Sequence, residues 1–118
     1  MTQENKDLLL RDLCARLPYG VKIQVPYEDG SGYFDETVWE VNNEGPFHVN
    51  GWGIEYEYVK PYLFPLSSIA KKTLEELSAY IDIKNAYVAV EFFNSHHIDY
   101  RGLIEKGLAV DATGLNIY

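Results

Sequence analysis

The sequence has little cysteine and no long apolar run, and each lack excludes a class of protein. Cys14 is the one cysteine among 118 residues, so no disulfide can form within the chain. No apolar run approaches the roughly 20 residues that a bilayer-spanning helix needs, and the polar start MTQENKD is the reverse of a signal peptide. We therefore expect a cytoplasmic protein with no membrane partner, in which Cys14 is a small residue in or near the core.

Lysine and arginine are absent between Lys22 and Lys60, and this lack confines the net charge to one acidic block. Because the rest of the chain is close to neutral, the block accounts for the whole net charge of −8. Its carboxylates are Glu28, Asp29, Asp35, Glu36, Glu40, Glu44, Glu55 and Glu57. An acidic surface repels phosphate backbones and lipid headgroups, so we expect no direct binding of nucleic acid.

Recognisable catalytic and cofactor motifs are also absent. The sequence contains no GxxxxGK[ST] or GxGxxG phosphate loop and no GxSxG nucleophile turn. His96 and His97 are adjacent, and neighbouring side chains on a helix point about 100° apart, so the two imidazoles cannot share one metal ion. We therefore expect no catalytic residue, no cofactor and no metal site. A small hydrolase-like enzyme using His96, His97 and Asp99 is an alternative.

The patterns that are present predict one α+β domain over 1–118. The stretch 4–17, ENKDLLLRDLCARL, predicts an amphipathic helix, with its leucines on one face and Asp12 and Arg16 elsewhere on the helix. Residues 21–59 alternate apolar and polar side chains around two turn signals, EDGSG and Asn50-Gly51. This region predicts a four-stranded antiparallel meander, and a small SH3-like half-barrel is another arrangement of the same strands.

The C-terminal half predicts two or three helices packed on the sheet. Residues 60–69 contain two prolines, so we expect an ordered crossing rather than a central strand. Ala70 to Ile81 have helical spacing, and 86–97 favour a helix although a strand fits the apolar run almost as well.

A final short helix is predicted after Asp99, which is suited to cap the segment YRGLIEK. Gly107 suits the left-handed position beyond the helix end, and Leu108 is expected to fold back as in a Schellman motif.

Aromatic residues are more abundant than a small core can hold, because the chain has ten tyrosines and two tryptophans that need polar partners. Tyrosine is enriched at protein interfaces, so an aromatic surface beside the carboxylates suits a basic or amphipathic protein partner. A homodimer and an acidic nucleic-acid mimic that inhibits a basic protein are alternatives. The residues predicted for this interaction surface are Trp52, Glu55, Tyr56, Glu57, Tyr58, Tyr62, His96, His97, Tyr100 and Arg101.

Two phrases carry a family resemblance: KPYLFPLSSI at 60–69 and FFNSHHIDYRGLIEKGLAVDA at 92–112. They resemble a family of short uncharacterised proteins widespread in gut Bacteroidetes. The resemblance implies a bacterial cytoplasmic protein encoded by a prophage or another mobile element, and it implies no activity, ligand or catalytic residue. From the residues alone, the second phrase is interpreted as a helix that docks on the sheet.

Overall fold

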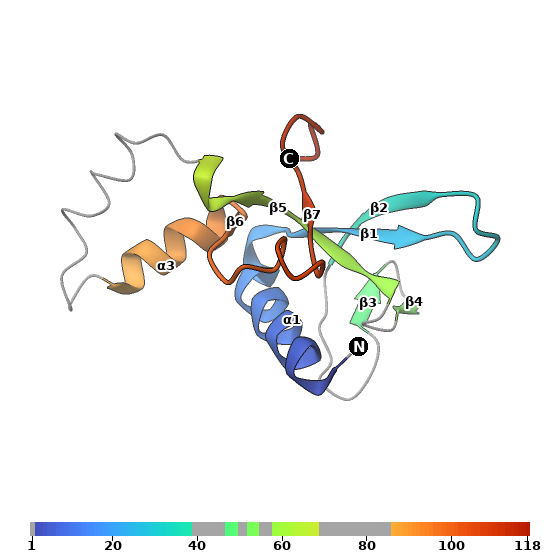
Figure 1. The fold of residues 1–118 in the computed structure, drawn as a ribbon, viewed down its shortest axis with the longest axis horizontal. Coiled ribbons are helices and arrows are strands. Elements are labelled where there is room, and N and C mark those ends of the chain that lie inside the picture. The colour runs from blue at the N-terminus through green and yellow to red at the C-terminus, as the bar shows by residue number, and fades with distance from the viewer. Residues whose placement is uncertain (1, 39–46, 50–51, 55–57, 69–85) are drawn as a thin grey trace.

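The computed structural model describes residues 2–38, 47–49, 52–54, 58–68 and 86–118. Two helices, seven strands and two 3-10 turns lie within these ranges (Figure 1). In chain order they are α1 (Gln3–Arg16), η1 (Leu17–Tyr19), β1 (Lys22–Pro26), β2 (Tyr33–Thr37), β3 (Phe47–Val49), β4 (Trp52–Ile54), β5 (Lys60–Pro65), η3 (Leu66–Ser68), α3 (Ala86–Ser95), β6 (Ile98–Asp99) and β7 (Val110–Asp111).

Helix α1 forms where the N-terminal pattern predicts it. The hydroxyl of Thr2 caps the helix by accepting a hydrogen bond from the Asn5 amide at 3.1 Å. Leu9 and Leu13, four residues apart on one face, are fully buried against Val21, Ile23 and other apolar side chains of the first core cluster. Packing of this face against the sheet therefore fixes α1.

Cys14 is exposed on α1, so the prediction that it lies in or near the core is wrong. On a helix each residue is rotated by about 100° from its neighbour, and the buried direction is occupied by Leu9, Asp12, Leu13 and Arg16. Cys14 therefore points away from the sheet.

The larger sheet is mixed and open, with the strand order β2-β1-β5-β6 and with β7 also paired to β5. β1 is antiparallel to β2 and to β5, whereas β5 runs parallel to β6 and β7. β3 and β4 form a hairpin in a separate two-stranded sheet. The predicted meander and half-barrel are therefore wrong, although β1 pairs with β2 and β3 pairs with β4 as predicted. Turn residues determine which neighbouring strands pair, but they do not determine that β1 takes β5 as its second partner.

Strand β5 lies inside the sheet, which contradicts the predicted crossing at 60–69. It changes partner along its length: Pro61 pairs with β1, Tyr62 and Leu63 pair with β7, and Phe64 and Pro65 pair with β6. A proline removes one ladder donor. Each of the three neighbouring strands pairs with only two residues of β5. The prolines near the two ends of β5 therefore interrupt no long row of backbone hydrogen bonds.

The C-terminal part contains one regular helix among the described residues. Residues 86–95 are helical, so the helix was the correct choice for this apolar run, while the predicted helix at 70–81 lies outside the described residues. The segment after Asp99 forms a single turn rather than a docked helix. Its end has the predicted Schellman bonds, from the Gly107 amide to the Ile104 carbonyl at 3.1 Å and from the Leu108 amide to the Leu103 carbonyl at 2.9 Å.

Candidate functional site

Among the described residues, buried charged side chains gather where α1 meets segment 93–101. Asp12 and Arg16, four residues apart on α1, are both fully buried. Nε of Arg16 donates to Oδ2 of Asp12 at 2.8 Å, and Nη1 of Arg101 donates to Oδ1 at 2.9 Å. We call Asp12, Arg16 and Arg101 the ionic node.

Arg16 also binds the backbone of two other elements. Its Nη1 donates to the Phe93 carbonyl at 3.3 Å, and its Nη2 donates to the Ile98 carbonyl at 2.5 Å. Phe93 lies in the last turn of α3, where carbonyl groups lack partners within the helix. A buried charge is tolerated when its hydrogen-bonding groups are satisfied. The hydrogen bonds of Arg16 therefore link α1 to α3 and to β6.

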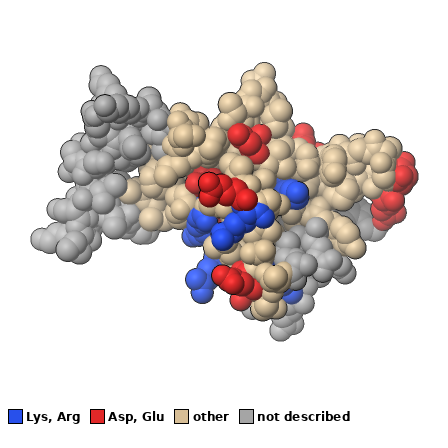
Figure 2. All heavy atoms as spheres, in the orientation of Figure 1, with Lys and Arg blue, Asp and Glu red and all other residues tan. Residues whose placement is uncertain are grey.

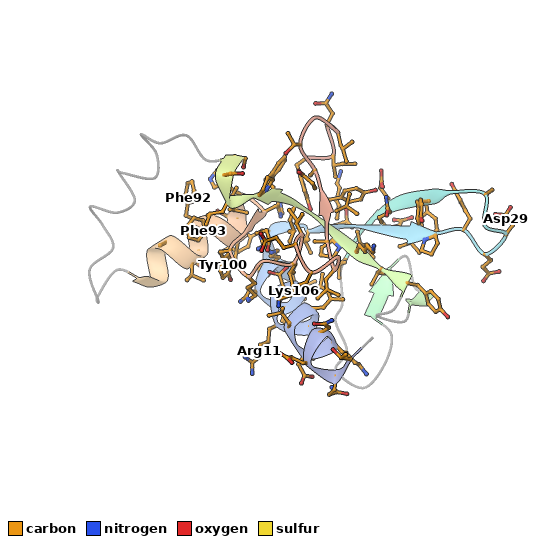
Figure 3. The ribbon with its side chains drawn as sticks, in the orientation of Figure 1. Arg11, Asp29, Phe92, Phe93, Tyr100 and Lys106 are labelled. Carbon is orange, nitrogen blue, oxygen red and sulfur yellow. The ribbon has the colours of Figure 1, made fainter. Side chains whose placement is uncertain are left out.

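Tyr100 covers the node from the solvent side. The Arg101 guanidinium lies 4.4 Å from the centre of the Tyr100 ring, and that of Arg16 lies 5.5 Å from it. The Tyr100 ring stacks on Phe93 at a centroid distance of 5.6 Å, and its hydroxyl donates to Oδ1 of the buried Asn94 at 2.9 Å. Figure 3 shows Phe92, Phe93 and Tyr100 gathered at the end of α3 that faces α1. Tyr100 is thus held in place by contacts within the chain.

The Asp99 carboxylate binds backbone amide groups. Its two oxygens accept hydrogen bonds from the amides of Leu103 and Ile104, each at 2.9 Å. Both amides begin the turn that ends at Gly107, so Asp99 is the N-terminal cap of that turn. The helix that Asp99 is predicted to cap does not form, but its carboxylate binds the first amides of the turn found there.

The two adjacent histidines lie in different environments. His96 is exposed, with its ring 4.4 Å from that of Phe92. His97 is buried, and its backbone has the left-handed conformation with φ 58°. The Nδ1 atom of its ring has no hydrogen-bond partner among the described residues. Burial, reinforced by the charges of Arg16 and His96, lowers the pKa of His97 to about 4. Within the described ranges, no three His, Cys, Asp or Glu side chains are grouped so that they could hold a metal ion.

The β1–β2 hairpin, defined here as residues 22–37, carries the described part of the acidic block away from the node (Figure 1). Its turn is stabilised by Oδ1 of Asp29, which accepts a hydrogen bond from the Ser31 amide at 2.9 Å. Hydrogen bonding from the Ser31 side chain, and then from this amide, lowers the pKa of Asp29. Glu28 and Asp29 are exposed at the tip, where Figure 2 shows a group of acidic side chains. Tyr27 and Tyr33 are 48% and 63% exposed beside them.

Asp35 connects the hairpin to β5. It accepts a hydrogen bond from the hydroxyl of Tyr62, which is buried. Burial and this bond raise the pKa of Tyr62 to about 12. Asp35 is therefore bound within the chain although it is exposed, whereas Glu28 lies at the exposed tip of the hairpin.

The structure does not gather the predicted interaction residues into one surface. Tyr62 and His97 are buried, Tyr100 and Arg101 are half-buried, and Tyr58 and His96 are exposed. Trp52 lies in β4, and residues 55–57 lie outside the described residues.

The sequence interpretation missed the charged pair in the core. Asp12 and Arg16 were assigned to the polar side of the helix because charged residues are rarely buried. Their i, i+4 spacing is compatible with an ion pair, but exposed helices use the same spacing. The partners that allow Asp12 and Arg16 to be buried are Arg101 and the carbonyls of Phe93 and Ile98, which all lie more than 70 residues away in the sequence.

Comparison of the chain with protein-family models, with curated proteins and with solved structures found no match. In the part of the chain that the structure describes, no helix combines the length and the apolar character needed to cross a membrane.

Proposed function

We propose that this chain is a non-enzymatic interaction module that binds a basic or amphipathic protein partner through its acidic segment. The β1–β2 hairpin carries the proposal. It combines exposed Tyr27 and Tyr33 with exposed Glu28 and Asp29, in a stretch of sequence without lysine or arginine between Lys22 and Lys60. Exposed tyrosines provide contact area at low conformational cost, and the carboxylates give charge complementarity to a basic surface.

The residues that suggested an enzyme support a structural role instead. Asp99 is bound to two backbone amides. The two histidines do not share one site, because His97 is buried and His96 is exposed. A general base must reach its substrate with a free basic atom. Segment 96–101 therefore supports a fold-stabilising role better than the hydrolase alternative.

The biological setting that we propose, an accessory protein of a bacterial mobile element, rests on the resemblance of the phrases at 60–69 and 92–112. It agrees with a small module that acts by binding another protein.

Affinity capture with paired variants tests the proposal. The hairpin variant Glu28→Lys/Tyr33→Ser reverses one exposed charge and removes one exposed ring. The control Glu105→Lys/Leu115→Ser reverses one charge and removes one large apolar side chain at exposed positions elsewhere. Both variants and the wild type are immobilised and exposed to lysate of a gut Bacteroidetes species. A partner retained by wild type and control but lost from the hairpin variant supports the proposal. Equal retention by all three contradicts it.

Competition with duplex DNA separates this reading from the nucleic-acid mimic. Because a mimic occupies a basic nucleic-acid groove, DNA would displace the chain from its captured partner. A partner that binds the chain and DNA at the same time supports an ordinary protein interface and rejects the mimic.

A further inference from the structure

The last residues of the chain, 113–118, leave β7 and return to the sheet, where Tyr118 is held by β1 and β5 (Figure 1). Its hydroxyl accepts from the Lys22 amide at 2.9 Å and donates to the Tyr62 carbonyl at 2.8 Å. Nζ of Lys22 donates to the Ile117 carbonyl at 2.9 Å. We call residues 113–118 the latch, because these bonds join it to two neighbouring strands.

The Tyr118 ring lies directly on His97. The two rings are nearly parallel, with an interplanar angle of 10° and centroids 3.8 Å apart. His97 is 7% exposed, and its Nδ1 is buried without a hydrogen-bond partner among the described residues. The phenol of Tyr118 keeps its proton at neutral pH, since burial raises its pKa to about 12. The closed latch therefore holds a neutral imidazole beneath a neutral phenol.

We propose that the latch is released when His97 becomes protonated. In the protonated ring both nitrogens carry a hydrogen, so Nδ1 becomes a donor for which the described residues offer no acceptor. Protonation also places a positive charge beneath the Tyr118 ring. A buried donor without a partner and a buried charge are both costly. Displacing Tyr118 admits water to the imidazolium and removes both costs.

The charged groups around the site oppose the extra charge. Arg16 from α1 and the neighbouring His96 both disfavour protonation of His97, and Lys22 from β1 is bound to the latch itself. The nearby carboxylates have other partners: Asp12 binds Arg16 and Arg101, and Asp99 binds two backbone amides.

The direction of the pH effect follows from linkage. Burial, then Arg16, then His96 lower the pKa of His97 in the closed state to about 4, against an ordinary value of 6.5. The open state therefore binds the proton more tightly, so the contribution of His97 to keeping the latch closed is complete above pH 6.5 and is lost as the pH falls toward 4. Within this window the ratio of open to closed molecules rises by up to about tenfold per pH unit.

Hydrogen exchange at the Lys22 amide tests the proposal, because this amide is bound to the Tyr118 hydroxyl. Protection factors are measured by NMR from pH 7 to 4.5 and compared with those of the Val38 amide, which donates to the Val21 carbonyl in the sheet. We expect protection at Lys22 to fall several-fold to tenfold per pH unit below pH 6, while protection at Val38 changes less. An equal change at both amides would show global unfolding and overturn the proposal.

Two variants identify the titrating group. His97→Asn keeps a residue type that tolerates the left-handed region and removes the titration, so protection at Lys22 should lose its pH dependence whatever its absolute level. His96→Gln removes the exposed neighbour and should retain most of that dependence. Retention of the full dependence in His97→Asn would contradict the latch.

Discussion

Segment 93–101 and the β1–β2 hairpin both concentrate aromatic and charged side chains, but the molecule uses them in different ways. In segment 93–101 the polar side chains form hydrogen bonds within the molecule: Tyr100, Arg101 and Asp99 bind other groups of the same chain. In the hairpin, Tyr33 and Glu28 face solvent. Unusual residue types therefore mark a candidate binding surface only when the fold leaves them accessible.

Removing the central arginine should produce the largest effect. Arg16→Met leaves the buried Asp12 with Arg101 as its one remaining cationic partner among the described residues, and it deprives the Phe93 and Ile98 carbonyls of their donor. We expect the free energy of unfolding to fall by about 3–5 kcal/mol, measured by urea denaturation. Arg11→Met, at an exposed position of the same helix, is the control. Equal losses for the two variants would contradict the role of the node.

Replacing both buried partners should cost less than the single changes imply. Asp12→Leu/Arg16→Met removes the two charges together, so no lone carboxylate or guanidinium stays buried on α1. In a double-mutant cycle we expect a coupling energy of about 1–3 kcal/mol. Strict additivity would mean that the pair does not act as a unit.

Loss of the Asp99 cap should have an intermediate effect. Asp99→Ala leaves the Leu103 and Ile104 amides without their acceptor, and we expect a loss of about 2 kcal/mol in the free energy of unfolding. Asp99→Asn keeps one acceptor oxygen and should lose less. An alanine variant as stable as the wild type would show that water replaces the carboxylate.

Tyr62→Phe should have the smallest effect on stability. It removes the hydroxyl that donates to Asp35, with an expected loss of about 1 kcal/mol at neutral pH, whereas Tyr58→Phe at an exposed position should lose nothing measurable. Because the pKa of Tyr62 is raised to about 12, its contribution is complete below pH 10 and disappears as the pH rises through 12. Ultraviolet titration of Tyr62→Phe should show one fewer late-titrating tyrosine; an unchanged curve would contradict this.

Features that depend on neighbouring residues could be predicted from the sequence. The helix at 3–16, the EDGSG turn, the Asp99 cap and the Schellman end at Gly107 each rest on residues within a few positions of one another. Local propensity and turn chemistry are sufficient there.

Features that depend on distant residues could not be predicted. β5 becomes an inner strand because three different strands each pair with two of its residues, and the prolines that argued against a strand are compatible with that arrangement. Asp12 and Arg16 are buried because residues 93–101 supply their remaining partners. The predicted interaction surface was divided for the same reason, since packing buried Tyr62 and His97 but left Tyr58 and His96 exposed.

Photo-crosslinking in cells of the host proposed from the family resemblance compares the two regions most directly. A photoreactive phenylalanine analogue replaces either Tyr33 in the hairpin or the exposed His96 in segment 93–101. Our account predicts a covalent adduct with a basic or amphipathic protein from position 33 and none from position 96. An adduct from position 96 with none from position 33 would contradict the account and move the interaction surface to segment 93–101.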